Sequence, residues 1–186
     1  MNRTALLLMD LMQTVVPTFG GDEALLARLR GATAAARAAD VMVIHVRVMF
    51  REGYPEVSPS NRTFSALARH FDFTERNPAI GLHAGVDVEA GDIHVTKRRI
   101  SAFSGSDLDL VLRSRGIDRL VLGGVATSGV VLSTLREAAD KDYRLCVLAD
   151  GCADRDPELH RVLTEKLFPT QAEVISVADW IETLPR

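Results

Sequence analysis

The sequence predicts an α/β protein built on a parallel sheet, and two observations carry that prediction. Short apolar runs alternate with helical patterns along the chain. Most of these runs are apolar at consecutive positions, which is typical of strands that are covered on both faces. The rhythm favours a single-domain, three-layer α/β/α doubly wound fold with right-handed crossovers. The 186 residues are enough for one core, so one domain over residues 1–186 is expected.

Residues at the ends of several expected helices support their bounds. Asp22 is a possible N-cap of the first long helix, Gly116 suits the position after a helix, and Asp156-Pro157 is a good cap and first-turn pair. Ser128 is expected to cap the helix after the fourth strand. The expected strands are 4–9, 41–48, 93–95, 119–122, 144–148 and 173–176, and the expected helices are 23–39, 107–115, 128–141, 157–167 and 177–184.

Composition excludes several classes of protein. A net charge of -3 gives no reason to expect a nucleic-acid or membrane partner, and no apolar run reaches the length of a membrane span. The N-terminal apolar run is interrupted by Asp10 and reads as a buried strand, not as a signal peptide. Cys146 and Cys152 suit a reducing compartment, so a cytoplasmic protein without disulfides is expected.

Residues 50–91 are the least regular section, with three prolines and several glycines. Such an insert is usually a lid, a binding loop or an oligomer contact. One helix is expected within it, near residues 61–70. Arg47, Arg51, Tyr54 and Asn61 are candidates to face a substrate, and an arginine here could clamp a carboxylate; solvated surface charge is the alternative.

Three strand ends carry the residues most suggestive of chemistry. Ligands of open parallel sheets bind beyond the carboxyl ends of the strands, so these ends could converge on one pocket. The first strand ends at Asp10 and the third at Lys97. The fourth runs into the small residues GGVATSGVV, 123–131, a strand–turn–helix corner whose amides favour an anion. The outward position of that corner holds Val130, which cannot act as a nucleophile.

Asp10 closes a run of apolar residues, where an isolated carboxylate is costly. It is either a turn or cap residue or a general acid or base held ionised by Lys97. Lys97 in turn is either that partner or a surface lysine of the basic cluster 97–99.

Together these motifs resemble the isochorismatase-like superfamily, also called the cysteine hydrolases. The resemblance rests on LLMD at 7–10, VTK at 95–97 with SAF at 101–103, GVATSGVV at 124–131 with ST at 133–134, and VLADGCAD at 147–154. It covers almost the whole chain in order and spacing. It implies a six-stranded parallel sheet with flanking helices, hydrolase activity on a small molecule, and a homodimer or higher homo-oligomer.

The resemblance also implies site residues. The family triad of Asp, Lys and Cys falls on Asp10, Lys97 and Val130, and a non-proline cis peptide is expected at Val125–Ala126. Family members that hydrolyse the vinyl ether of isochorismate carry glycine at the cysteine position, and their aspartate is thought to supply the acid–base step. Valine is bulkier than glycine, so that analogy is partial. Further substrate or oxyanion contacts are expected from these positions: Val125, Ala126, Thr127, Gly129, Phe103 and Arg47.

No substitute nucleophile is evident from the sequence. Cys146 and Cys152 read as buried apolar residues, and Ser128 has no evident histidine base. His45 reads as a core histidine, and the histidines show no metal-ligand spacing, so neither a metal nor another cofactor is expected. Three functions remain open. The first is a hydrolase of an amide, urea-like or vinyl ether bond that needs no cysteine, and the second is a non-catalytic relative that binds a small ligand or acts as a structural subunit. The third is an unrelated α/β binding module, which the absence of a contact between Asp10 and Lys97 would favour.

Overall fold

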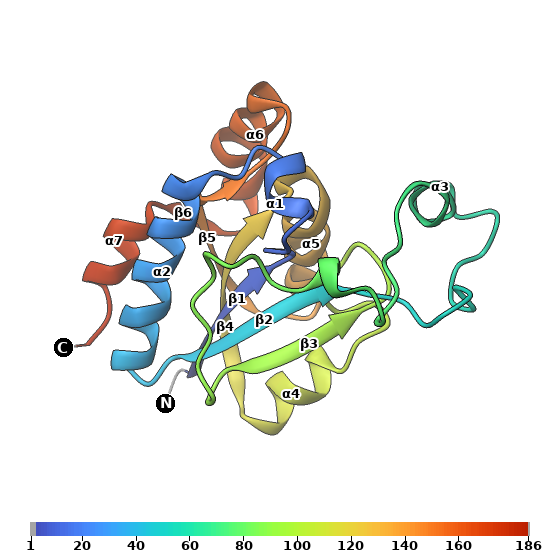
Figure 1. The fold of residues 1–186 in the computed structure, drawn as a ribbon. Helices are drawn as coiled ribbons and strands as arrows, with labels where there is room; N and C mark the ends of the chain where they lie inside the picture. Colours follow the sequence, from blue (N-terminus) through green and yellow to red (C-terminus); the bar gives the residue numbers. More distant parts are fainter. Residues whose placement is uncertain (1–2, 186) are drawn as a thin grey trace.

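The computed structural model describes residues 3–185, which form one six-stranded parallel sheet in the order β3-β2-β1-β4-β5-β6 (Figure 1). The chain runs outward from β1 to β3, returns to the other side of β1 with β4, and then continues to β6. The carboxyl ends of β1 and β4 therefore flank the topological switch point, where ligands of such folds bind. The strands are β1 (Arg3–Met9), β2 (Met42–Val48), β3 (Ile93–Lys97), β4 (Ile117–Val125), β5 (Arg144–Ala153) and β6 (Glu173–Ile175).

Helices cover both faces of the sheet and divide the core in two. On one face α2 and α7 bury residues such as Leu29 and Trp180 against Leu6 and Leu8 of β1. On the other face α4 and α5 pack on the alternate side chains of the same strands. The helices are α1 (Val15–Thr18), α2 (Glu23–Ala38), α3 (Arg62–His70), α4 (Leu108–Ser114), α5 (Leu132–Asp140), α6 (Pro157–Val162) and α7 (Val177–Glu182).

The predicted fold class is confirmed, and the differences lie at element ends. β4 and β5 extend several residues beyond their expected ends, and α1 was not expected. The long helix expected from Ser128 is instead a π-helical turn, Thr127–Val131, followed by α5. Ser128 is therefore not a helix N-cap, because it lies inside that turn and Ala126 precedes it. Asp22 and Asp156 cap α2 and α6 as expected.

Gly124 lets β4 approach the end of β1 closely. It has a φ of +135°, and a Cβ at this position would stand 2.1 Å from the Met9 carbonyl oxygen. Only glycine can adopt this conformation without strain. The close approach sets the corner after β4 directly beside Asp10, which follows Met9.

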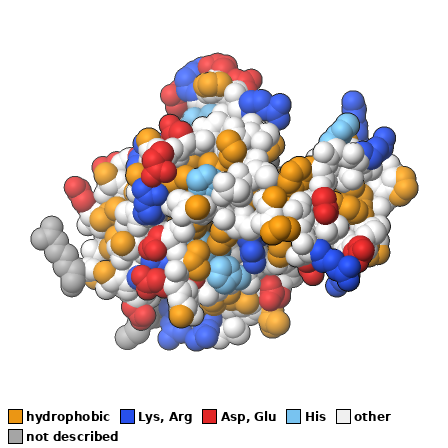
Figure 2. All heavy atoms as spheres, in the orientation of Figure 1, with side chains coloured by type: hydrophobic (Ala, Val, Ile, Leu, Met, Phe, Trp, Pro, Cys, Tyr) orange, Lys and Arg blue, Asp and Glu red, His pale blue; other side chains and the backbone are white. Residues whose placement is uncertain are grey.

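Residues 51–73 form an arm that carries α3, which stands away from the sheet (Figure 1). The chain rejoins the body where Leu82 pairs with Met12. The Asn61 side chain caps α3 by accepting a hydrogen bond from the Phe64 amide. The Tyr54 hydroxyl accepts a hydrogen bond from the Phe73 amide at 2.7 Å. Both side chains thus stabilise the arm itself. On the face shown in Figure 2, positive and negative side chains are interspersed over the arm and the body. Within residues 3–185, no helix is long and apolar enough to span a membrane.

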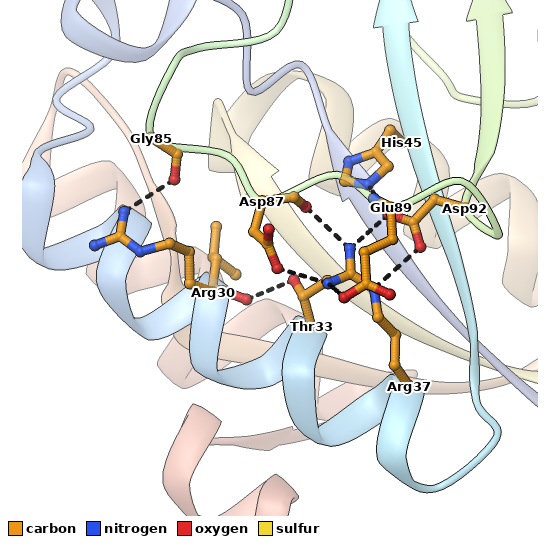
Figure 3. A network of polar contacts seen from close by, with 9 residues as sticks. Arg30, Thr33, Arg37, His45, Gly85, Asp87, Glu89 and Asp92 are labelled. Atoms are coloured by element: carbon orange, nitrogen blue, oxygen red, sulfur yellow. Dashed lines mark hydrogen bonds and ion pairs between the residues drawn. The ribbon is translucent and has the colours of Figure 1, made fainter.

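The segment before β3 is held to α2 and β2 by an ionic network in which the Asp92 side chain is buried and Asp87 and Glu89 are exposed (Figure 3). Arg37 of α2 pairs with Asp92 at 2.6 Å and also with Asp87 and Glu89. Asp92 in turn bonds the fully buried His45 ring at 2.9 Å. His45 is the core histidine that the sequence predicted. Burial acts to raise the pKa of Asp92, but hydrogen bonds and the Arg37 charge outweigh it and lower that pKa to about 2.

This network predicts a loss of stability in acid. A carboxylate with a depressed pKa stabilises the fold above its unfolded value, and that contribution disappears as the pH falls through the folded value. Between about pH 4 and pH 2 we expect Asp92 to cost the protein about 2 kcal/mol of unfolding free energy. Urea titrations across this range will measure it. The Arg37→Met variant should lose most of this acid-dependent slope, and an unchanged slope would contradict the assignment.

Candidate active site

Asp10 and Lys97 meet at the carboxyl edge of the sheet. Lys97 Nζ lies 2.9 Å from Asp10 Oδ2 and also donates to the Arg99 carbonyl oxygen at 3.0 Å. Asp10 is 6% exposed and Lys97 is 2% exposed, so the ion pair is shielded from water. Sequence reasoning left a turn residue and a surface lysine as alternatives for these positions; the structure instead shows a buried carboxylate–ammonium pair.

The Asp10 backbone is held in an unusual conformation. Its φ is +54°, in the left-handed region, while its amide donates to the Val46 carbonyl oxygen at 2.9 Å. Aspartate tolerates this region better than most residues do. The turn directs the chain away from β1, and the carboxylate reaches Lys97 two strands away.

The two Asp10 carboxylate oxygens have different surroundings. Oδ2 is engaged by Lys97, whereas Oδ1 is buried and has no hydrogen-bond partner among the described residues. Burial raises the pKa of Asp10, and the charge and hydrogen bond of Lys97, with the Val48 backbone, oppose that rise. The net direction is upward, which leaves a carboxyl group that can both accept and return a proton.

The corner after β4 lies beside this pair. The peptide bond Val125–Ala126 is cis, at the position that the resemblance implies. The amides of Gly129 and Val131 both donate to the Ala126 carbonyl oxygen, at 3.1 and 3.3 Å. The Gly129 amide is thus already engaged, whereas the amides of Ala126 and Thr127 have no partner among the described hydrogen bonds.

Val130 faces the apolar core that α4 and α5 cover. It is 3% exposed, and Phe103 of the same cluster is 7% exposed. Cys152 belongs to this cluster too, and burial raises the pKa of its thiol to about 12; burial likewise raises the pKa of Cys146 to about 11. Both cysteines are free, buried and poorly ionised, as the sequence predicted, so neither replaces a nucleophile at Val130.

Arg47 is set apart from the ion pair. It lies opposite Thr96 in the parallel pairing of β2 with β3 and follows His45 by two positions. Because side chains two positions apart share a face of a strand, Arg47 lies on the face of the sheet that α2 covers. No hydrogen bond or ion pair joins it to any residue between 3 and 185, and burial lowers the pKa of its guanidinium. The structure therefore does not bring Arg47 into contact with Asp10 or Lys97.

An open groove of about 800 Å³ runs along the exposed edge of β3, next to the site. Thr96, Arg98 and Arg99 line it, together with Arg51 from the arm, but Asp10, Lys97 and Val130 do not. The link to the ion pair is the Arg99 carbonyl, which accepts a hydrogen bond from Lys97. Arg51 pairs with Glu56 at 2.5 Å, so this substrate candidate is already engaged within the arm.

Two hydrogen bonds at the corner were not foreseen from the sequence. Thr127 Oγ1 lies 2.8 Å from His160 Nδ1, and the Ser128 amide donates to Asp154 Oδ2 at 2.7 Å. The VLADGCAD motif gave a weak signal for Asp154, since it ends at that residue. Nothing in the spacing of His160 pointed to the corner.

Fold and site together define a class: a doubly wound α/β protein with a buried carboxylate–ammonium pair beside a strand–turn–helix corner. Residues 4–179 match the family model of the isochorismatase domain. The chain therefore belongs to the isochorismatase family, the family of the cysteine hydrolases that its motifs resemble.

Two relatives agree with this assignment, and a solved structure shows the same fold. The chain is 31% identical over 186 residues to the uncharacterized isochorismatase family protein YecD of Escherichia coli O157:H7, covering 97% of this chain and 96% of that one. It is 34% identical over 180 residues to the ureidoacrylate amidohydrolase RutB of Stutzerimonas stutzeri, covering 84% and 72%. An isochorismatase family structure from Desulfovibrio vulgaris has a TM-score of 0.88 at 24% identity and full coverage of both chains.

Proposed function

We propose that this protein hydrolyses a small molecule through Asp10 and Lys97, without a cysteine nucleophile. The carrying observation is the Asp10 carboxylate, which has one oxygen engaged by Lys97 and one buried oxygen without a partner among the described residues. Among amide, urea-like and vinyl ether bonds, the ureidoacrylate amidohydrolases among the relatives favour a urea-like C–N bond as the target.

The proposed reaction assigns one task to each group. Asp10 Oδ1 takes a proton from water, and the water oxygen attacks the carbonyl carbon of the substrate. The oxyanion that forms accepts hydrogen bonds from the Ala126 and Thr127 amides, which have no other described partner. Asp10 then returns the proton to the leaving nitrogen as the C–N bond breaks. Lys97 holds Oδ2 throughout and stabilises the ionised carboxylate.

The raised pKa of Asp10 suits this exchange of a proton. A carboxyl group with an ordinary pKa would be a weak base and would seldom be protonated near neutral pH. Burial moves the Asp10 pKa upward, toward the pH at which it works. The same upward direction would serve protonation of a vinyl ether, in which Asp10 acts first as an acid.

One observation favours the second candidate function, a non-catalytic ligand-binding or structural relative. Val130, Ala126 and Phe103 are 3%, 8% and 7% exposed, and the groove beside β3 is not lined by the ion pair. A bulky apolar residue at position 130 occupies space that a substrate would use. Hydrolysis therefore requires the segment after β3 or the corner to open.

Replacement of Asp10 separates the two functions. N-carbamoyl amino acids, ureidoacrylate, simple amides and a vinyl ether will be incubated with the protein, with release of ammonia or loss of the vinyl ether absorbance as the readout. We expect turnover of a ureido compound that falls at least about 100-fold in Asp10→Asn. Asparagine tolerates the positive φ of this position and removes only the proton acceptor.

The matched control is Asp118→Asn. Asp118 is half exposed and pairs with Arg144 near the amino end of β4, away from the carboxyl edge. Turnover by the Asp118→Asn variant should equal turnover by the unaltered protein. Equal turnover in Asp10→Asn, or none by the unaltered protein across the whole panel, would reject the hydrolase and favour the non-catalytic relative.

A further inference from the structure

Asp154, which directly follows β5, and His160 of α6 form hydrogen bonds to two consecutive residues of the corner. Asp154 Oδ2 accepts the Ser128 amide at 2.7 Å, and His160 Nδ1 is hydrogen-bonded to Thr127 Oγ1 at 2.8 Å. Thr127 is completely buried, and His160 is half-buried. The two bonds therefore join the end of β5 and helix α6 to the residues that immediately follow Ala126.

In this structure Thr127 is not presented to a substrate as a nucleophile, although it is hydrogen-bonded to a histidine. Its exposed fraction is 0%, against 6% for Asp10. Its hydroxyl instead ties the residue to α6. The function of the pair must therefore lie in what it does to the backbone of Thr127.

The backbone of Thr127 is where the corner meets a substrate oxyanion in the proposed reaction. The Ser128 amide is occupied by Asp154, and the Gly129 amide by the Ala126 carbonyl. The two amides that remain without a hydrogen-bond partner among residues 3–185 are those of Ala126 and Thr127. Oxyanion donors act only when they are held at the right place before the reaction, because a small misplacement loses most of their benefit.

We propose that His160 is a positioning residue that sets the direction of the Ala126 and Thr127 amides through the Thr127 hydroxyl. This inference rests on the proposed hydrolysis at the corner. Asp154 acts with His160, because it withdraws the Ser128 amide and so restricts the oxyanion to the two amides that precede it. Burial lowers the pKa of His160, against the opposing charge of Asp154, so the ring that holds Thr127 is neutral at pH 7.

The test uses a thiol at position 130 as a probe, so that it needs no natural substrate. In Val130→Cys, p-nitrophenyl acetate acylates the thiolate through a tetrahedral oxyanion: the C–S bond forms and p-nitrophenolate leaves. Iodoacetamide alkylates the same thiolate by displacing iodide, and no oxyanion forms. Both reactions need the same thiolate, so the ratio of the two rate constants reports oxyanion stabilisation independently of changes in thiol ionisation.

In the Val130→Cys background we expect His160→Ala and Thr127→Val each to lower this ratio about tenfold or more. Their effects should not add, since both break one hydrogen bond. His160→Asn can place an amide near the position of Nδ1 and should keep the ratio within about twofold. Thr33→Val is the control, since it removes another buried hydroxyl bond, within α2 to the Leu29 carbonyl, which involves neither Thr127 nor Ser128.

Two outcomes would overturn the inference: an unchanged ratio in His160→Ala, or equal losses in His160→Ala and His160→Asn. If the probe thiol reacts with neither reagent, amide hydrogen exchange of the protein with Val130 retained decides instead. The Ser128 amide should then exchange at least about tenfold faster in His160→Ala and not in His160→Asn; equal exchange rates would reject the role. The result is independent of Asp10, whose replacement tests the hydrolase itself.

Discussion

Replacement of Lys97 by methionine is expected to destabilise the protein by about 3–5 kcal/mol at pH 7. Methionine keeps the length and the apolar stem of lysine but removes the ammonium group. Asp10 is then left buried without a counter-charge, and an uncompensated buried carboxylate is far more costly than the lost attraction alone. Urea unfolding at pH 7, followed by circular dichroism, will measure the loss.

The pH dependence of this loss identifies Asp10 as its cause. The folded pKa of Asp10 is raised above 3.8, so the stability it contributes is present below that value and is lost as the pH rises through the folded pKa. Without Lys97 the pKa rises further, because burial then acts unopposed. The deficit of Lys97→Met relative to the unaltered protein should therefore shrink as the pH is lowered toward 4 and grow as it is raised.

A second variant provides the control. Asp10→Asn/Lys97→Met replaces the buried ion pair by a neutral pair, and asparagine retains the left-handed backbone of position 10. This double variant should be more stable at pH 7 than Lys97→Met alone. If it is equally unstable, then lost packing at position 97, and not the stranded charge, accounts for the effect.

The position of Asp10 and Lys97 illustrates what sequence alone could predict. Asp10 directly follows β1, whose last five residues are buried, and Lys97 is the last residue of β3. Parallel strands bring their carboxyl ends to one edge of the sheet. That argument needs only periodicity and topology, and it brought the two residues together. It could not say which oxygen of the carboxylate is engaged, since that depends on the positive φ of Asp10.

The corner after β4 shows where such reasoning stops. Small residues between a strand and a helix predict a tight turn, but they do not predict a π-helical turn, and the helix start at Ser128 was wrong for that reason. The contacts of His160 and Asp154 join segments 33 and 26 residues apart. Long-range polar contacts of this kind leave no periodic signal. Arg47 is a different case. It lies one residue before the expected end of β2, but alternation along the strand assigns it to the α2 side of the sheet, and its role in binding a substrate stays a prediction.

Replacement of Val130 by cysteine should create a thiol whose pKa lies below the ordinary value of about 8.5. The position lies in the turn Thr127–Val131 at the start of α5, where backbone amides favour a negative charge, and Lys97 supplies a positive charge at the same carboxyl edge of the sheet. Valine and cysteine are similar in volume, so the fold should tolerate the change at a cost below about 1.5 kcal/mol. The measurement is the rate of iodoacetamide labelling as a function of pH.

The two native cysteines should not contribute to the labelling. Burial raises the pKa of Cys146 to about 11 and that of Cys152 to about 12, so neither should be labelled between about pH 6 and pH 9. Ser60→Cys, at an exposed position in the arm, gives the reference for an ordinary thiol. If the labelling rates of the Val130→Cys and Ser60→Cys thiols give the same pKa, the corner does not stabilise a thiolate, and the prediction is wrong.

An absence of labelling up to about pH 9 would carry a different meaning. Val130 is 3% exposed, so iodoacetamide can reach a thiol at this position only if the corner or the segment after β3 opens. The proposed hydrolysis requires the same opening, because the ion pair is equally buried. Labelling with a depressed pKa would therefore support both a site that admits small molecules and a corner that stabilises negative charge. A thiol that iodoacetamide does not label would contradict a site that admits small molecules, and with it the proposed activity.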